Sequence, residues 1–320
     1  MKAKARAHTN IALIKYWGKR DEDLSLPMNS SLSLTLDKFF TETQVEFDSA
    51  FSEDVFFLNG EEDSKTLPKI SKVLDLFRDI KCIKDRARVT SINKVPTAAG
   101  LASSASAFAA LGAAANKASG LNLNNRELST IVRRGSGSAT RSIYGGIVEW
   151  KKGDSDNTSF AVEIDDASWD IGMVVVIVNS NEKKISSREG MKRTVLTSPF
   201  YNVWPKDAEE DLNEIKFAIR NIDFERMGYI TENNALKMHA TMLSANPPII
   251  YFEPNSILVM QIVHELRKKG IEAFFTMDAG PNVKILCKLS QADIIKNRLM
   301  EDFKEEEIII TGPGPGAKII

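Results

Sequence analysis

A serine-rich stretch at Pro96–Ser106 combines residue types that can hold a phosphate group. It reads Pro-Thr-Ala-Ala-Gly-Leu-Ala-Ser-Ser-Ala-Ser, so small residues leave backbone N–H groups accessible and serines offer hydroxyls to an anion or its metal. Residues 107–115 follow and are strongly helix-forming. A loop of small residues entering a helix presents free N–H groups and the positive end of the helix dipole. The stretch therefore predicts a phosphate site, with a flexible loop before a closely packed helix as the alternative.

A second cluster of small residues surrounds an arginine at residues 135–142, which read Gly-Ser-Gly-Ser-Ala-Thr-Arg-Ser. Arg141 could clamp a phosphate or carboxylate through two parallel hydrogen bonds. The alternative is a glycine-rich connector with an exposed arginine. The first cluster is not a Walker A loop, because no Gly-Lys-Ser/Thr follows Gly100. Two such clusters in one chain favour a ligand with several negative charges.

Two further stretches have the composition of anion sites, and one carboxylate could act beside them. Lys15–Arg20 reads Lys-Tyr-Trp-Gly-Lys-Arg, and residues 183–191 read Lys-Lys-Ile-Ser-Ser-Arg-Glu-Gly-Met. Each could also be an ordinary solvated turn or helix start. Asp278 begins Asp-Ala-Gly-Pro-Asn after an apolar segment, which is a good turn sequence. A carboxylate at such a strand end could also orient or deprotonate a substrate hydroxyl.

Composition limits the class of protein. The chain has 320 residues, with 42 Lys and Arg against 43 Asp and Glu, so no basic excess indicates nucleic acid or an anionic membrane as a partner. No apolar run approaches the roughly 18 residues of a membrane span, and the N-terminus lacks the apolar core of a signal peptide. Cys82 and Cys287 lie in apolar or strand-like surroundings, which predicts two buried free thiols. We expect a cytoplasmic protein.

The pattern of apolar residues predicts an α+β fold in two parts. Residues 2–14 are expected to form an edge strand, and 31–36 alternate as a strand with one buried face. Asn124 is expected to cap a helix through Arg133, with Glu127 completing a capping box. Near residue 180 the sequence becomes richer in charged residues and in helical patterns. We therefore predict two domains, 1–180 and 181–320. Further helices are predicted at 205–220, 224–243, 255–269 and 291–301, and further strands at 43–48, 55–58, 88–93, 171–178, 272–277, 283–289 and 307–310.

The loop at 96–105 resembles the second motif of the GHMP kinase superfamily, which usually reads Gly-Leu-Gly-Ser-Ser. Here Ala102 replaces the middle glycine, as in the diphosphomevalonate decarboxylase branch. Thr140 stands where relatives often have Cys, and Lys94 where some have Asn. Five other segments resemble the same branch: His8–Arg20, Leu26–Ser33, Gly135–Ser142, Ser186–Met191 and Met277–Asn282.

This resemblance implies a GHMP-kinase fold and a reaction. The N-terminal half would resemble a ribosomal-S5-type domain and the C-terminal half would be ferredoxin-like, with ATP and substrate in the cleft between them. The reaction would be ATP-dependent decarboxylation of 5-diphosphomevalonate to isopentenyl diphosphate, with ADP, phosphate and CO₂ released. Relatives are often homodimers. A mevalonate 3-kinase or a phosphomevalonate decarboxylase is the nearest alternative, and a non-catalytic ATP- or RNA-binding module is a more distant one.

The resemblance also assigns roles. Asp278, Arg141 and Lys19 would be catalytic, with Lys19 close enough to Asp278 to keep it ionised at the cost of basicity. The substrate would contact seven residues: Tyr16, Lys19, Ser138, Arg141, Ser187, Arg188 and Asp278. ATP would contact ten: Ser91, Asn93, Gly100, Leu101, Ala102, Ser103, Ser104, Ala105, Ser106 and Ser136. Mg²⁺ is expected with ATP, and Ser104 is its candidate ligand, since no carboxylate ligand can be named.

Overall fold

The computed structural model describes residues 1–94, 103–179, 181 and 185–320. Its first sheet has the strand order β14-β1-β4-β7-β5-β6, and β8 and β9 extend it beside β4. All described pairings in this sheet are antiparallel except β5 with β7. Its strands are β1 (Lys2–Ile14), β4 (Ser31–Asp48), β5 (Val55–Leu58), β6 (Glu61–Glu62), β7 (Arg86–Asn93), β8 (Ile147–Trp150), β9 (Ala161–Asp165) and β14 (Lys318–Ile319). A separate hairpin joins β2 (Lys19–Asp21) to β3 (Leu26–Pro27).

Burial along β4 shows how the two halves of the chain meet. From 41 to 48 its residues alternate between buried and partly exposed positions, as expected for a strand with one covered face. From 31 to 36 every residue is buried. Leu32 and Leu34 pack in a core with residues of α5 and of the C-terminal sheet, while Ser31 and Ser33 meet Arg141 on the opposite face.

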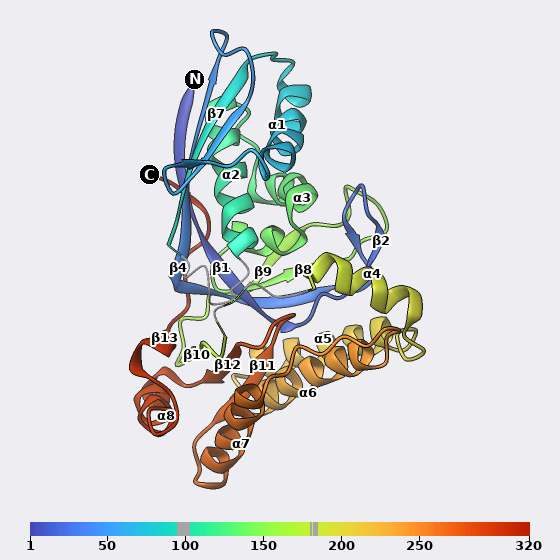
Figure 1. The fold of residues 1–320 in the computed structure, drawn as a ribbon, viewed down its shortest axis with the longest axis vertical. Helices are drawn as coiled ribbons and strands as arrows, with labels where there is room; N and C mark the ends of the chain where they lie inside the picture. Colours follow the sequence, from blue (N-terminus) through green and yellow to red (C-terminus); the bar gives the residue numbers. More distant parts are fainter. Residues whose placement is uncertain (95–102, 180, 182–184) are drawn as a thin grey trace.

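Three helices and a 3₁₀ segment cover one face of the first sheet (Figure 1). They are α1 (Leu67–Lys81), α2 (Ser103–Ser119), α3 (Asn125–Gly135) and η1 (Gly137–Ile143). The small side chains of α2 let it approach β1 and β4 closely, and Ala109, Ala110 and Ala114 are fully buried. The predicted capping box forms at the start of α3: Asn124 Oδ1 accepts from Glu127 N, and Glu127 Oε2 accepts from Asn124 N.

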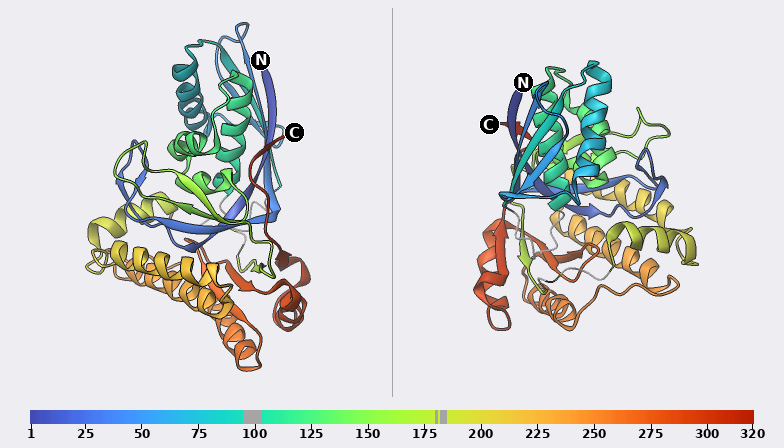
Figure 2. Two further views of the ribbon diagram at one scale, coloured as in Figure 1. Left: turned by 180° about the vertical axis from the view of Figure 1, so that it is seen from behind. Right: turned by 45° about the horizontal axis from the view of Figure 1, so that its top comes forward.

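The second sheet has the antiparallel order β11-β12-β10-β13, which gives a ferredoxin-like arrangement along the chain. The helices α5 and α6 lie between the two sheets (Figure 2), and α7 and α8 pack on the other face of the second sheet. Its strands are β10 (Gly172–Val176), β11 (Ala273–Met277), β12 (Val283–Cys287) and β13 (Ile308–Thr311). The helical segments are α4 (Ser187–Thr197), α5 (Trp204–Arg220), α6 (Phe224–Leu243), α7 (Pro254–Lys268), η2 (Leu289–Gln291), α8 (Ala292–Leu299) and η3 (Glu305–Glu307).

The last residues return to the first sheet. Pro313 forms a bridge with Leu36, and β14 then pairs with β1, which brings the two termini near each other (Figure 1). The prediction that 2–14 is an edge strand is therefore wrong, because the distant C-terminal strand covers that edge. The division at residue 180 stays a prediction, although β10 already pairs within the second sheet.

The other sequence predictions differ mainly where long-range packing decides. The strands predicted at 31–36 and 43–48 form one continuous strand, β4. Cys287 is a buried thiol as predicted, but Cys82 is exposed at the C-cap of α1, where its φ is 57°. Among the described residues, no helix is both long enough and apolar enough to span a membrane.

Candidate active site

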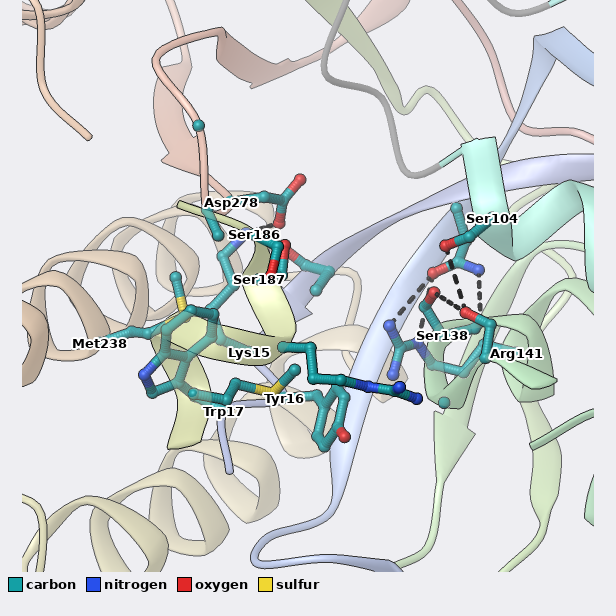
Figure 3. A pocket seen from close by; sticks show the side chains of 18 of the residues that line it. Lys15, Tyr16, Trp17, Ser104, Ser138, Arg141, Ser186, Ser187, Met238 and Asp278 are labelled. Atoms are coloured by element: carbon teal, nitrogen blue, oxygen red, sulfur yellow. Dashed lines mark hydrogen bonds and ion pairs between the residues drawn. The ribbon is translucent and has the colours of Figure 1, made fainter. Parts of the chain in front are cut away.

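A cleft of about 690 Å³ lies where the two halves meet. Its walls include the end of β1 and the turn after it, the first turns of α2, the segment around η1, the N-terminus of α4, one position on α6, and the β11–β12 turn. Figure 3 shows Ser104, Ser138 and Arg141 on one side of this pocket and Asp278, Ser186 and Ser187 on the other. Segments far apart in the sequence therefore present polar groups to one space.

Asp278 is held by two lysines from different halves of the chain. Lys15 Nζ lies 2.8 Å from Asp278 Oδ1, and Lys284 Nζ lies 3.3 Å from Asp278 Oδ2. Burial alone would raise the pKa of Asp278, but the charges and hydrogen bonds of Lys15 and Lys284 outweigh it and hold that pKa well below its ordinary value. The carboxylate is therefore ionised and weakly basic.

Local contacts fix Lys15, which directly follows β1. Its backbone N–H donates to Asn234 Oδ1 on α6 at 2.8 Å, and its Nζ also donates to Ala12 O at 2.8 Å. Burial lowers the pKa of Lys15, which the Asp278 charge partly offsets. The sequence placed Lys15 in a candidate anion-binding stretch but gave it no role beside Asp278, and Lys284 was not predicted as a site residue. A lysine within the apolar run 283–287 was the available signal for the second.

The expectation that Lys19 neighbours Asp278 is wrong for this structure. Lys19 Nζ lies 3.2 Å from Glu22 Oε2 and 3.3 Å from Ser25 Oγ, within its own hairpin. Its side chain is 7% exposed and still lines the cleft. Burial lowers the pKa of Lys19, and Glu22 opposes this effect. The cation that we expected beside Asp278 is supplied instead by Lys15 and Lys284.

Arg141 lies buried in a ring of neutral acceptors. Its guanidinium donates to Ser33 Oγ at 2.9 Å, to Ser31 Oγ at 2.5 Å, and to Asn10 Oδ1 at 3.3 and 3.2 Å. Burial lowers its pKa to about 10, with Asp278 acting in the opposite direction. A buried cation bonded to neutral groups is favourable mainly when an anion joins it. The alternative of an exposed connector arginine is therefore excluded.

The turn after β1 contains a glycine in a left-handed conformation and is held by two hydrogen bonds from residues of the C-terminal half. Gly18 has φ +103°, and a Cβ there would lie 1.8 Å from the hydroxyl oxygen of Tyr201. Tyr201 Oη donates to Trp17 O at 2.8 Å, and Trp204 Nε1 donates to the same oxygen at 3.2 Å. These two hydrogen bonds place Tyr16 on the cleft wall.

The hydroxyl of Tyr16 is buried and finds no hydrogen-bond partner among the described residues. Its ring packs edge-on against Trp150, with centroids 4.8 Å apart. Burial raises the pKa of this hydroxyl well above its ordinary value, so it stays protonated and can donate. An unpaired buried donor on a cleft wall fits an anionic ligand.

Serine hydroxyls line the opposite wall. Ser136 Oγ lies 3.2 Å from Ser104 Oγ and 3.1 Å from Ser138 Oγ, so three predicted residues form one row. Ser104 is exposed near the N-terminus of α2, where free N–H groups favour phosphate. Ser187 and Arg188 begin α4, whose N-cap Ser186 accepts from Glu189 N at 3.2 Å, and both line the cleft.

Other predicted ATP residues lie elsewhere or outside the described chain. Ala105 and Ser106 face inward from α2, and Ser106 Oγ lies 2.8 Å from Thr41 Oγ1 of β4. Ser91 and Asn93 lie on β7 and bond to threonines of β4. Their contact with a nucleotide stays a prediction. Gly100, Leu101 and Ala102 lie outside the described residues, and Ser103 begins α2.

The described residues contain no cluster of three or more His, Cys, Asp or Glu side chains that could hold a metal. A row of hydroxyls next to a phosphate site suits Mg²⁺, because this ion commonly keeps several waters and takes its other ligands from substrate phosphates. Ser104 fits such a role.

Comparison with known proteins gives matches along the whole chain. Residues 7–161 match the model of a diphosphomevalonate decarboxylase-like N-terminal domain, and 173–312 match that of a mevalonate 5-diphosphate decarboxylase C-terminal domain. The diphosphomevalonate decarboxylase of Homo sapiens is 37% identical over 305 residues, which cover 87% of this chain and 75% of the relative.

Solved structures match the fold closely. Mevalonate diphosphate decarboxylase from Staphylococcus aureus is 50% identical, with a TM-score of 0.97 over 100% of this chain and 98% of that one. The structure of MDDEF in complex with MVAPP, AMPPCP and magnesium is also 50% identical, with a TM-score of 0.95 over 100% of this chain and 99% of the other.

Replacing Tyr16 by Phe tests whether its hydroxyl waits for a ligand. We expect the free energy of unfolding to stay equal or rise by up to about 1 kcal/mol, because an unpaired buried hydroxyl is costly. Affinity for pyrophosphate, measured by calorimetry, should weaken about tenfold. The matched control Tyr201→Phe loses the bond to Trp17 O and should unfold more easily. Equal destabilisation by both variants, with pyrophosphate binding unchanged, would contradict the prediction.

Replacing Asp278 by Asn tests the charge cluster through its pH dependence. The variant leaves Lys15 and Lys284 without their carboxylate, so the free energy of unfolding should fall by about 3 kcal/mol at neutral pH. Because the folded-state pKa of Asp278 is depressed, its contribution is complete above its ordinary pKa of about 3.9 and is lost as the pH falls further. Urea unfolding of both proteins should show a difference that narrows only below about pH 4. A difference independent of pH would disprove this.

Proposed function

The chain belongs to the diphosphomevalonate decarboxylase family, with the GHMP-kinase fold, and on this premise we propose how its cleft performs the reaction. The protein is an ATP-dependent decarboxylase of the mevalonate pathway of isoprenoid biosynthesis. It converts (R)-5-diphosphomevalonate to isopentenyl diphosphate and releases ADP, phosphate and CO₂. The observation that carries the assignment of roles is that Asp278 and Arg141 line one cleft with the serine row and the start of α4.

The chemistry requires a better leaving group than hydroxide. The terminal phosphoryl group of ATP forms a bond to the substrate's 3-oxygen while its bond to the bridging oxygen breaks and that electron pair leaves with ADP. The hydroxyl proton passes to solvent. The C3–O bond then breaks and its electron pair leaves with phosphate. The bond between the carboxylate carbon and C2 breaks as CO₂ departs, and that electron pair forms the C2–C3 double bond. The departing phosphate accepts the electrons, so the substrate needs no further electron sink.

We assign to Asp278 the orientation of the 3-hydroxyl. An ionised carboxylate held on both oxygens can accept a hydrogen bond from the hydroxyl and aim its oxygen at the phosphoryl donor. Its depressed pKa makes it a poor base early in the reaction. The proton would leave late, when phosphoryl transfer has made the oxygen more acidic.

We assign the anionic groups of the substrate to the cations and hydroxyls of the cleft. Arg141 suits the carboxylate, because its buried guanidinium has neutral partners and spare N–H donors. Tyr16, Lys19 and Arg188 suit the diphosphate, supported by their shared cleft. Ser138 and Ser187 would complete this set.

The protein uses ATP with Mg²⁺. We propose that Ser104 and Ser136 contact the phosphates, and that Ser104 is the metal ligand. Mg²⁺ neutralises charge on the nucleotide when bound. Ser91, Asn93, Ser103, Ala105, Ser106 and residues 100–102 remain proposed nucleotide contacts from the resemblance. A cytoplasmic location is likewise proposed, supported by two unpaired thiols, and a homodimer stays a prediction.

A single-turnover assay tests this proposal. Purified protein with ATP, Mg²⁺ and 5-diphosphomevalonate should release one CO₂ for each ADP. Asp278→Asn should slow both products together by about 10²- to 10⁴-fold, while binding of a nonhydrolysable ATP analogue is retained. ADP without CO₂ would indicate a 3-kinase, and turnover of the monophosphate alone would indicate a phosphomevalonate decarboxylase. Either result would overturn the assigned roles.

A further inference from the structure

Lys284 is a buried lysine in an otherwise apolar strand. It lies on β12, paired with Val175 of β10 and Thr276 of β11, and its side chain is 1% exposed. Taking an ammonium group out of water is costly unless its partners compensate. The packing of this strand does not require a charged residue. The role of Lys284 therefore follows from the groups that its Nζ contacts.

Those contacts join both ends of the turn that carries the site carboxylate. Lys284 Nζ lies 3.3 Å from Asp278 Oδ2 and donates to Asn282 O at 3.1 Å. Asn282 Oδ1 in turn accepts from the backbone N–H groups of Val178 and Asn179, at 2.7 and 2.9 Å. The lysine therefore links Asp278 to its own turn, and the turn to the end of β10.

Lys15 and Lys284 differ in whether a ligand in the cleft can contact them. Lys15 lines the cleft, so a bound substrate can compete for its N–H donors. Lys284 lies on β12 within the second sheet and does not line the cleft, so a bound ligand competes less directly for its Nζ. With Lys15 alone, one oxygen would be held and the carboxylate could rotate as the substrate enters.

We propose that Lys284 is a positioning residue for the reaction, which fixes the plane and charge of the Asp278 carboxylate from inside the second sheet. This rests on the role assigned to Asp278 under the proposed function. Lys284 does not touch the substrate; it acts through Oδ2 and through the turn. Among the described residues, the other charged or titratable groups that interact with Asp278 are Lys15, which directly follows β1, Arg141 from η1 and His239 from α6.

Lys284→Met is the test, because it keeps the length of the side chain and removes its charge. With 5-diphosphomevalonate, kcat should fall by about 10- to 100-fold, since misplacing a reacting group is that costly. KM should change by less than about threefold, because the diphosphate contacts lie elsewhere. Lys288→Met is the matched control: it breaks the ion pair with Glu272 beside the same strand and should leave both constants unchanged.

A titration of Asp278 distinguishes a positioning role of Lys284 from a general disruption of the structure. In ligand-free protein labelled with carbon-13 at aspartate Cγ, the Asp278 signal is assigned by its loss in Asp278→Asn. In Lys284→Met its titration should move up by about one pH unit or more, toward the ordinary range, and Lys288→Met should leave it in place. A fall in kcat without this movement, or neither effect, would overturn the proposal.

Two further results keep the test decisive. If Lys284→Met does not fold, the Nζ signal of Lys284 in nitrogen-15 lysine-labelled protein should shift on Asp278→Asn, and the Lys288 signal should not. No shift would overturn the contact itself. The wild-type assay in the same series reports on the proposed function separately: normal CO₂ release with an unaffected Lys284→Met enzyme refutes only the role of Lys284.

Discussion

The arrangement of this protein depends on one carboxylate shared by two buried lysines where its halves meet. Lys15 directly follows the first strand of one sheet, whereas Asp278 lies in the turn after β11 and Lys284 lies on β12 of the other sheet. The ion pair between Lys15 and Asp278 therefore joins the two halves of the chain. Buried charges are tolerable only when partners meet them closely. This requirement selects one relative placement of the two sheets, and the same placement creates the cleft.

The cleft presents cations and hydrogen-bond donors that suit negatively charged ligands. Arg141 is buried among neutral acceptors, and the Tyr16 hydroxyl has no hydrogen-bond partner in the described part of the chain, so both keep donors available in advance. Lys19 is met by Glu22 from its own hairpin, which an entering diphosphate could replace. Donors fixed before binding need little rearrangement during the reaction, which is how a site stabilises developing charge efficiently. The hydrogen bonds that Tyr201 and Trp204 donate to Trp17 O also hold the turn that carries Tyr16 in place before binding.

Features set by neighbouring residues were predictable from the sequence, and features set by distant contacts were not. The helix at 224–243 and the capping box of Asn124 follow from periodicity and a spacing of three residues. The grouping of Asp278, Arg141, the serine row and the start of α4 in one site is the exception, because it was implied by the family resemblance and not by neighbouring residues. The cation beside Asp278 was misassigned, because both lysines are distant from Asp278 in the sequence and only the packing shows that Lys15 reaches it while Lys19 pairs with Glu22. Ser106 was grouped with Ser104, although two further helical positions turn it toward the sheet.

The central claim is that Asp278 directs the 3-oxygen of the substrate at the phosphoryl donor, so that this oxygen leaves as part of phosphate. The most direct test is to supply 5-diphosphomevalonate labelled with oxygen-18 in its 3-hydroxyl and to analyse the released phosphate by mass spectrometry. The account predicts one labelled oxygen in each phosphate, formed in step with CO₂. Unlabelled phosphate accompanying CO₂ release would contradict it, because the hydroxyl would then have left by a route that Asp278 does not direct.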